Sequence, residues 1–298
     1  MLEPIYEQQE MLAAIPADTT ETRVIELWLA QKQSLQTRRA YINDLARLKT
    51  FVNGKALRQI NLLELQDFVD SLDSLADTSK HRVMSAIKSF YSFCATNGYM
   101  RFNVASSIAL GHLEDTTTER LISEADAIRM IALEPNTRNH AILRLLYIAG
   151  LRAAEICGLS WRNCSAIGDA VELAIFGKGA KTRKVLIPAD MWREMEALRG
   201  TAIDTDPVFT SRKGAGRLST TQIYRIVNAA ALRAKVKVTD SKSLVSPHWL
   251  RHAHVSHALD AGAATHVVQQ TVGHSSQTTT SRYAHKKASE SSAFYIKA

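Results

Sequence analysis

The chain has 298 residues, of which 46% are hydrophobic and 22% are charged, and its formal net charge is +8 at pH 7. This composition is typical of a soluble globular protein, and the length exceeds what one hydrophobic core usually holds, so we expect two compact domains. No apolar run approaches the roughly 20 residues that cross a bilayer, and the N-terminal MLEPIYEQQE is acidic where a secretory signal is basic. We therefore expect a cytoplasmic protein with no membrane segment.

The positive charge is unevenly distributed along the chain. Residues 1–116 carry 12 Lys and Arg against 14 Asp and Glu, whereas residues 117–298 carry 25 against 15. A basic surface confined to one domain favours a polyanionic partner, because each phosphate contact releases condensed counterions. Charge alone leaves a merely basic enzyme equally open. The three cysteines, Cys94, Cys157 and Cys164, have no C-x-x-C spacing, so neither a disulfide framework nor a zinc site is expected.

Residues 1–20 show no helical or strand period, so we expect a flexible lead-in there. Four amphipathic helical patterns follow and predict an all-helical domain over residues 21–105. The third of them carries the residues of a capping box, in which two side chains cap the first turn of a helix. The first pattern lies within residues 22–33, the second begins near Thr37, and the third begins at Asn61, with Glu64 three residues later. The fourth runs from Thr78 to a stop at Asn97 and Gly98.

Residues 106–120 lose this periodicity and are predicted to be a linker. Beyond it, the runs VELAIF and RKVLIP flank GKGAKT, a pattern that predicts a β-hairpin with a glycine-rich turn. The fold class that we predict is mainly α, with a small antiparallel sheet in the second domain. The helical patterns of this domain are SEADAIRMIA, NTRNHAILRLLYIAGLRAAEICGLSW with a break at Gly150, 189–198, 220–234 and 247–260.

The segment SPHWLRHAHVSHALDAG predicts a helix that begins with Ser246 as its N-cap and Pro247 in its first turn. His248 and Arg251 then share one face near the N-terminus, where a phosphate binds well. His248 and His252 also have a spacing that can chelate zinc. However, no third ligand is nearby and Arg251 repels a cation, so we expect no metal.

Two further stretches carry cations in unusual places. GKGAKTRK places Lys178, Lys181, Arg183 and Lys184 within seven residues, where a hairpin tip could push a lysine into a DNA groove or toward a leaving group, or simply be a solvated turn. Arg152 lies between Leu151 and Ala153, so we expect it to be buried and to need a partner. That partner is either Glu155 or a bound phosphate.

The order of these residues resembles the tyrosine recombinase (phage integrase) family. The pattern runs from Arg152 through Lys178 and His248-x-x-Arg251 to Gly273-His274 and then Tyr283, in GHSSQTTTSRYAH. The resemblance covers about residues 20–286 and is nearest to the Xer-like, two-domain branch. It implies a core-binding, SAM-like domain over 21–105, a catalytic α+β domain over 121–286, and a tail, 287–298, that docks on a neighbouring protomer.

The resemblance also implies roles for individual side chains. Tyr283 is expected to attack the scissile phosphodiester, forming a 3′-phosphotyrosyl bond and expelling a 5′-hydroxyl. Arg152 and Arg251 are expected to bind the non-bridging oxygens, with Glu155 orienting them. The remaining roles are proton transfer from the tyrosine by His248, a hydrogen bond to the phosphate from His274, and protonation of the leaving oxygen by Lys178. No metal or other cofactor is expected.

The implied partner is double-stranded DNA, bound by a homotetramer or together with a paralogous partner recombinase, and a nucleoid-associated location follows. Two alternatives are a type IB topoisomerase-like relaxing activity, which uses the same chemistry, and a non-catalytic DNA-binding regulator. Against the regulator, all six catalytic positions are present. Trp249 and Val104 depart from the family's common pattern, but neither has a catalytic role. The basic residues expected at the DNA are Arg38, Arg39, Lys80, Lys88, Lys181, Arg183, Lys184, Arg212 and Lys213.

Overall fold

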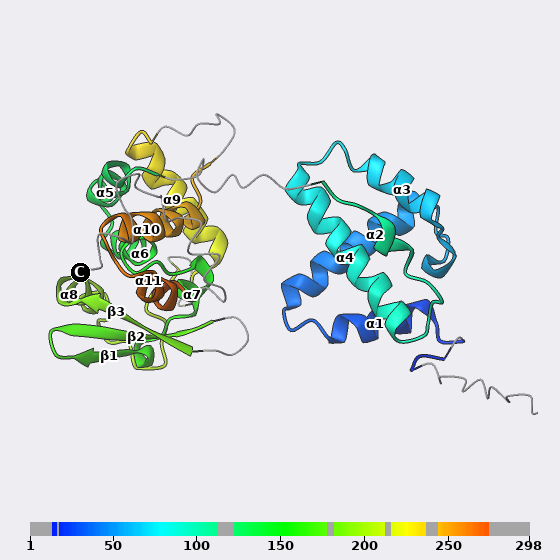
Figure 1. The fold of residues 1–298 in the computed structure, drawn as a ribbon. Helices are drawn as coiled ribbons and strands as arrows, with labels where there is room; N and C mark the ends of the chain where they lie inside the picture. Colours follow the sequence, from blue (N-terminus) through cyan, green and yellow to red (C-terminus); the bar gives the residue numbers. More distant parts are fainter. Residues whose placement is uncertain are drawn as a thin grey trace, which may run out of the picture. The chain divides into compact units, whose positions relative to one another are not determined.

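The computed structural model describes residues 14–16, 18–111, 122–177, 182–211, 216–236 and 244–273. The chain divides into two compact units, Met1–Glu114 and Asp115–Ala298 (Figure 1). Each unit has its own hydrophobic core. The division falls within the expected linker 106–120, most of which lies outside the described residues. Over the described ranges, no helix combines the length and the apolar character that crossing a membrane requires.

The N-terminal unit is helical in every element that is described. The capping box predicted at Asn61 is confirmed, because the Glu64 amide donates to the Asn61 side chain and the Asn61 amide donates to the Glu64 carboxylate, both at 3.0 Å. The stop after the last long helix is also as expected, with Gly98 at φ +74°. The elements are α1 (Glu21–Ala30), α2 (Leu35–Phe51), η1 (Leu57–Gln59), α3 (Leu62–Ser71), α4 (Asp77–Thr96) and η2 (Val104–Ser107).

An aromatic group fixes α1 against α2 and α4. The fully buried Trp28 stacks on Tyr41 at 5.2 Å between ring centroids and meets Phe90 edge-on at 5.3 Å. Its indole N–H donates to the Ser89 hydroxyl at 3.2 Å, so the one polar atom of this ring is satisfied. The helical patterns therefore bury the faces that their periodicity predicted.

The C-terminal unit combines helices with a three-stranded antiparallel sheet of order β1-β2-β3, so the predicted fold class is confirmed. The hairpin expected around GKGAKT is formed by β2 and β3, whereas β1 was not predicted. The elements are α5 (Glu124–Ala132), α6 (Thr137–Tyr147), α7 (Ala153–Gly158), η4 (Trp161–Asn163), β1 (Cys164–Ile167), β2 (Ala170–Phe176), β3 (Thr182–Pro188), α8 (Ala189–Glu196), α9 (Thr220–Arg233), α10 (Pro247–Asp260) and α11 (Thr265–Val272).

One face of the sheet is buried and positions the later elements. Leu173 pairs with Val185 and Ile175 pairs with Arg183 across β2 and β3. Since side chains alternate along a strand, Arg183 lies on the same face as the buried Val185 and Ile187. Helix α8 packs on β2 and β3, α7 contacts β2, and α11 contacts β3. The β2–β3 hairpin thus packs against both α7 and α11.

Helix α10 is central to the helical part of this unit. It contacts α5, α6, α9 and α11, and Figure 1 shows it among these helices. Leu250, Ala253 and Val255 are therefore buried, and so is Arg251, of which only 2% is exposed. A charged side chain in this position must find hydrogen-bond acceptors inside the protein.

Candidate active site

The C-terminal end of α11 is the point where the candidate residues meet. This helix ends at Gly273, which adopts the left-handed conformation at φ +66°. The last carbonyl groups of any helix lack partners within the helix, and the helix dipole makes this end negative. Three arginines, which we call the arginine cluster (Arg152, Arg183 and Arg251), donate to three successive carbonyls at this end.

Arg251 is the buried member of the arginine cluster. Its Nη1 donates to the Gly150 carbonyl and its Nη2 to the Val272 carbonyl. The buried guanidinium therefore links the turn before α7 to the end of α11.

Arg152 is the exposed member, with 39% of its side chain accessible. The expectation that it is buried is therefore wrong: Arg152 is the N-cap residue of α7, and its side chain reaches solvent although the preceding Gly150 and Leu151 are buried. Of the two partners considered, Glu155 is in contact with it: Nη1 of Arg152 donates to Oε1 of Glu155 at 2.9 Å. Longer contacts of 3.4 Å join Arg152 to the carbonyls of Val272 and Gly273.

Glu155 is a buried carboxylate held by two arginines. Arg183 contacts both of its oxygens, at 2.7 and 2.8 Å, and the backbone amide of Arg152 donates to Oε2 at 2.8 Å. Burial by itself raises the pKa of Glu155, but these hydrogen bonds and the arginine charges outweigh it and lower the pKa. The carboxylate is thus ionised, and the guanidinium groups of Arg152 and Arg183 both contact it.

Arg183 was expected at the DNA, but its side chain is only 14% exposed and is engaged within the protein. Besides Glu155, it contacts the Thr271 carbonyl through Nε at 2.7 Å. The strand alternation that places Arg183 beside Val185 and Ile187 was present in RKVLIP and could have revealed this orientation.

His248 lies at the start of α10, after Ser246 as the N-cap residue and Pro247, as predicted. It is exposed, and its ring meets that of His252 edge-on at 4.4 Å between centroids. Over the ranges that the structure describes, no group of three His, Cys, Asp or Glu could hold a metal ion.

A close approach of backbone and side chain fixes the turn before Arg152. Gly150 has φ +61°, and a Cβ there would lie 2.6 Å from Cδ2 of His254 and 3.0 Å from Cγ1 of Val272. His254 is mostly buried, and this burial lowers its pKa to about 4, helped by the nearby Arg251 and His257 charges, although a hydrogen bond to the Tyr147 backbone opposes the shift. Local sequence patterns do not reveal these contacts, because they arise only where α10 and α11 approach this turn.

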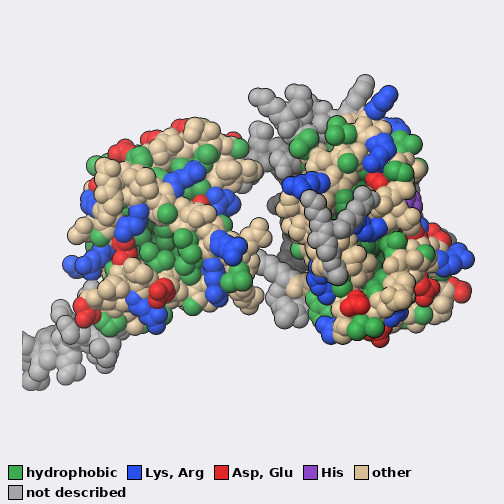
Figure 2. Space-filling view, turned by 180° about the vertical axis from the view of Figure 1, so that it is seen from behind, with side chains coloured by type: hydrophobic (Ala, Val, Ile, Leu, Met, Phe, Trp, Pro, Cys, Tyr) green, Lys and Arg blue, Asp and Glu red, His purple; other side chains and the backbone are tan. Residues whose placement is uncertain are grey.

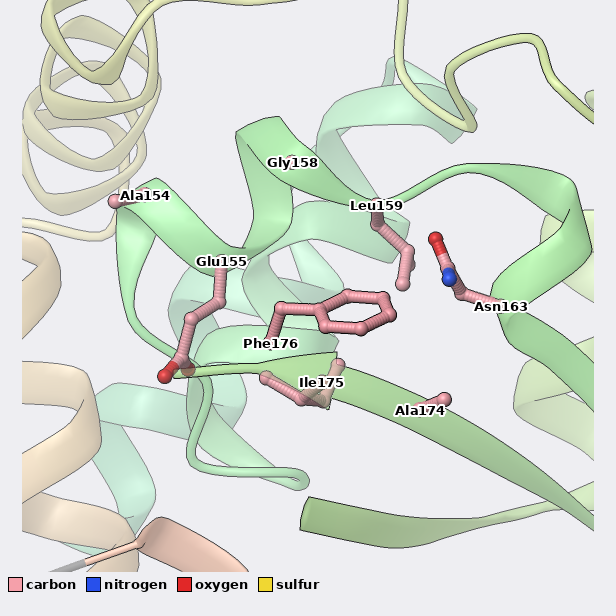
Figure 3. Close-up of a pocket in the computed structure, with 8 residues that line it drawn as sticks. All are labelled: Ala154, Glu155, Gly158, Leu159, Asn163, Ala174, Ile175 and Phe176. Carbon is pink, nitrogen blue, oxygen red and sulfur yellow. The ribbon is translucent and has the colours of Figure 1, made fainter. Parts of the chain in front are cut away.

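Glu155 also lines a small cavity between α7 and β2. Figure 3 shows its side chain at one side of this space and the ring of Phe176 between the helix and the strand. The cavity has a volume of about 50 Å³. Since pockets for small organic ligands usually have several hundred Å³, it is far too small for a nucleotide or a similar cofactor.

Three of the six predicted catalytic residues are described, namely Arg152, His248 and Arg251. Lys178, His274 and Tyr283 lie outside the described residues. The residues that precede two of them are described, however. Phe176 ends β2 two residues before Lys178, and Gly273 directly precedes His274.

The other basic residues expected at the DNA are in varied surroundings. Arg38 donates to the Lys32 carbonyl at 2.6 Å and to that of Ala30, the last residue of α1, at 3.4 Å, and Lys80 pairs with Asp73. Lys184 is exposed and pairs with Glu172 at 3.0 Å. Arg39 is exposed and Lys88 is half-buried, while Lys181, Arg212 and Lys213 lie outside the described residues. Figure 2 shows Lys and Arg side chains at many separate points on the visible face of each unit.

Comparison with known proteins bears directly on this arrangement. Residues 112–290 match the model of the phage integrase family, and residues 24–98 match that of the phage integrase N-terminal SAM-like domain. The chain is 31% identical over 279 residues to tyrosine recombinase XerD of Pseudomonas aeruginosa, covering 87% of this chain and 89% of XerD. The chain belongs to the phage integrase family of tyrosine recombinases. It is accordingly a tyrosine-type site-specific recombinase.

Solved structures share the fold of this recombinase. The XerH site-specific recombinase bound to its difH substrate matches with a TM-score of 0.69 and 18% identity, over 91% of this chain and 82% of that chain. A lambda integrase tetramer bound to a Holliday junction matches with a TM-score of 0.71 and 14% identity, over 90% and 77% of the two chains. The predicted resemblance to the Xer-like branch is thereby confirmed.

Proposed function

We propose that this recombinase cleaves and rejoins double-stranded DNA at a specific site through a 3′-phosphotyrosyl intermediate formed by Tyr283. Its positively charged arginine cluster, gathered at the end of α11 directly before His274, is the observation that carries the proposal. Negative charge on the non-bridging oxygens grows as the phosphorus is attacked, so preorganised guanidinium groups stabilise the transition state more than the ground state.

In the first step, the Tyr283 oxygen forms a bond to phosphorus and the bond from phosphorus to the 5′-oxygen breaks. The phenol, with an ordinary pKa of about 10, is a weak nucleophile at neutral pH and must lose its proton as it attacks. His248 takes part in this proton transfer, and Lys178 protonates the leaving 5′-oxygen. Attack by another 5′-hydroxyl on the phosphotyrosine reverses the step and joins new strands.

Arg152 and Arg251 have different tasks in this scheme. Arg152 is partly exposed at the N-terminus of α7 and directs its charge to a phosphate at the surface. Arg251 is held by two backbone carbonyls from different elements, so its position is fixed before DNA binds. His274 adds a hydrogen bond to the same phosphate. An open surface of this kind suits a duplex, which cannot enter a closed pocket.

The domain arrangement that we propose comprises a core-binding unit over 21–105, a linker over 106–120 and a catalytic unit over 121–286. Strand exchange between two duplexes needs four active sites, which a tetramer supplies. The tetrameric lambda integrase complex, whose fold is similar, supports such an assembly. The tail 287–298 contains apolar residues and is proposed to dock on a neighbouring protomer.

The nucleophile is tested by Tyr283→Phe on a nicked suicide substrate, which traps the covalent intermediate. The variant should bind this DNA as tightly as the wild type but form no protein–DNA adduct, because it lacks the attacking oxygen. Tyr224→Phe is the matched control, since Tyr224 is an exposed tyrosine on α9 with no assigned role. Adducts that persist in Tyr283→Phe would show that another residue is the nucleophile.

A further inference from the structure

The proposed mechanism gives no role to Arg183, although its whole guanidinium group is engaged by the protein. All three of its guanidinium nitrogens donate hydrogen bonds: Nε to the Thr271 carbonyl at 2.7 Å, and Nη1 and Nη2 to Glu155 at 2.7 and 2.8 Å. The two parallel contacts with the carboxylate form the bidentate geometry that makes arginine–carboxylate pairs strong and directional. A side chain that is 14% exposed and held in this way is poorly placed to reach a DNA backbone.

The contacts of Arg183 join three elements of the active site. Arg183 lies on β3, five residues after Lys178, and thus on the hairpin that carries this lysine. Glu155 lies in the first turn of α7, next to Arg152, and Thr271 lies in the last turn of α11, three residues before His274. One side chain therefore connects the chain segments that lead to three of the proposed catalytic groups.

Each of the two carboxylate oxygens of Glu155 accepts hydrogen bonds from both Arg183 and Arg152. Oε1 accepts from Nη1 of both arginines, and Oε2 accepts from Nη2 of Arg183 and the Arg152 backbone amide. Without Arg183, Arg152 would be the only described cation in contact with the Glu155 carboxylate, whose negative charge would then offset its own positive charge. With Arg183 present, Glu155 and Arg183 form a neutral pair, and the charge of Arg152 is available to a phosphate.

We infer that Arg183 is a positioning residue for phosphoryl transfer. Arg183 neutralises Glu155, so that the positive charge of Arg152 stays available to the phosphate, and it anchors the end of α11 beside the reacting phosphate. This inference rests on the proposed function, because it assigns Arg183 an effect on the charge that develops at the scissile phosphate. It also replaces the expected DNA contact with a role inside the protein.

The experiment compares the single-turnover rate of adduct formation on two suicide substrates at saturating protein. One has the ordinary scissile phosphate and the other a methylphosphonate, which lacks the charge that Arg152 neutralises. For Arg183→Ala we expect a rate about 30-fold below wild type on the phosphate and within about 3-fold of wild type on the methylphosphonate, since the lost effect is electrostatic.

Arg144→Ala is the matched control. Arg144 is equally buried, with 15% of its side chain exposed, and pairs with Glu194 and Asp190, away from the arginine cluster. Loss of a buried ion pair at this site should change the rate of adduct formation on both substrates by the same factor. If Arg183→Ala also slows both substrates by one common factor, its role is merely structural and the inference is overturned.

A DNA contact predicts a different result. Loss of a phosphate contact weakens binding and reduces the slope of log affinity against log salt by about one, whereas a positioning residue leaves both unchanged. A reduced slope in Arg183→Ala would therefore overturn the inference. If this variant does not unfold cooperatively, Arg183→Gln decides, because it removes the charge and keeps a hydrogen-bond donor to Glu155: a rate loss confined to the phosphate substrate supports positioning, and an equal rate loss on both substrates contradicts it.

The outcome is separable from that of the proposed function. A wild-type protein that forms adducts through Tyr283 satisfies the proposed function whatever Arg183 does. Conversely, absence of adducts from the wild type on both substrates contradicts the proposed function and with it the role inferred for Arg183.

Discussion

Arg251 and Arg152 show how the same side chain is used in two ways within one cluster. Arg251 is 2% exposed and donates to two backbone carbonyls, which replace the water that a buried guanidinium loses. Arg152 keeps 39% of its side chain exposed and shares Glu155 with Arg183. The buried arginine is therefore held in one position, and the half-buried one keeps part of its guanidinium at the surface, where we propose that a phosphate binds.

His254 predicts a specific dependence of stability on pH. Burial lowers its pKa in the folded state from 6.5 to about 4. Between these two pH values His254 is therefore mostly protonated in the unfolded chain and mostly neutral in the folded one. The contribution of His254 to the free energy of unfolding should be constant above about pH 7. It should fall between pH 6.5 and 4, by on the order of 3 kcal/mol in total.

This dependence is measured by urea unfolding at several pH values for wild type and His254→Gln. The difference between the two free energies of unfolding isolates His254 from the carboxylates that titrate in the same range. We expect the stability of the variant to fall less steeply than that of the wild type below pH 6.5. Parallel curves would show that His254 has no lowered pKa in the folded protein.

Several residues of the site could be assigned from the sequence, and Arg183 shows why others could not. The spacing of His248 and Arg251, and that of Arg152 and Glu155, places each pair within one or two turns of a helix, where neighbours are known from sequence alone. Arg183 of β3 meets Glu155 of α7 and Thr271 of α11 only because the sheet packs against both helices. Contacts between distant elements depend on packing, which local patterns do not specify.

At the scale of elements, the turn between α6 and α7 connects the core to the site. Gly150 takes a positive φ there, and its carbonyl accepts from Arg251. A side chain at this position meets His254 and Val272, so the glycine is required both for the backbone conformation and for the approach of α10 and α11.

Gly150→Ala should therefore lower both stability and cleavage. Gly168→Ala is the control, because Gly168 has a similar φ of +55° but no atom within 4 Å of the added Cβ. Both variants should lose about 1 kcal/mol from the backbone strain, and Gly150→Ala about 1–3 kcal/mol more from overpacking. Urea unfolding and adduct formation measure the two effects, and equal losses in the two variants would contradict a packing role for Gly150.

Helix α11 and strand β1 were missing from the sequence prediction for physical reasons. Five of the eight residues in THVVQQTV are β-branched, which disfavours a helix, and Ala264 gives no side-chain cap. The helix forms because Val268 and Val272 are buried against Val255 of α10. Strand β1 has four residues and one exposed edge, so it carries little of the alternation that identifies strands.

For the whole molecule, the sequence gives a correct account of the fold class and of the family. Two separate hydrophobic cores match the two-domain expectation from chain length, and the helical periodicity of the first unit is strong enough to be read directly. The order of catalytic residue types along the chain identified the family before any contact between them was known. The arrangement of the arginine cluster, in contrast, requires the folded C-terminal unit.

The central claim is that Tyr283 becomes covalently linked to the 3′ side of a cleaved DNA strand beside this cluster. The most direct measurement is mass spectrometry of the proteolysed adduct from a suicide substrate, together with chemical analysis of the released DNA end. We expect the nucleotide on the peptide that contains Tyr283, joined through a 3′-phosphate, and a free 5′-hydroxyl on the other fragment. A nucleotide on any other residue, or a link through a 5′-phosphate, would contradict the account.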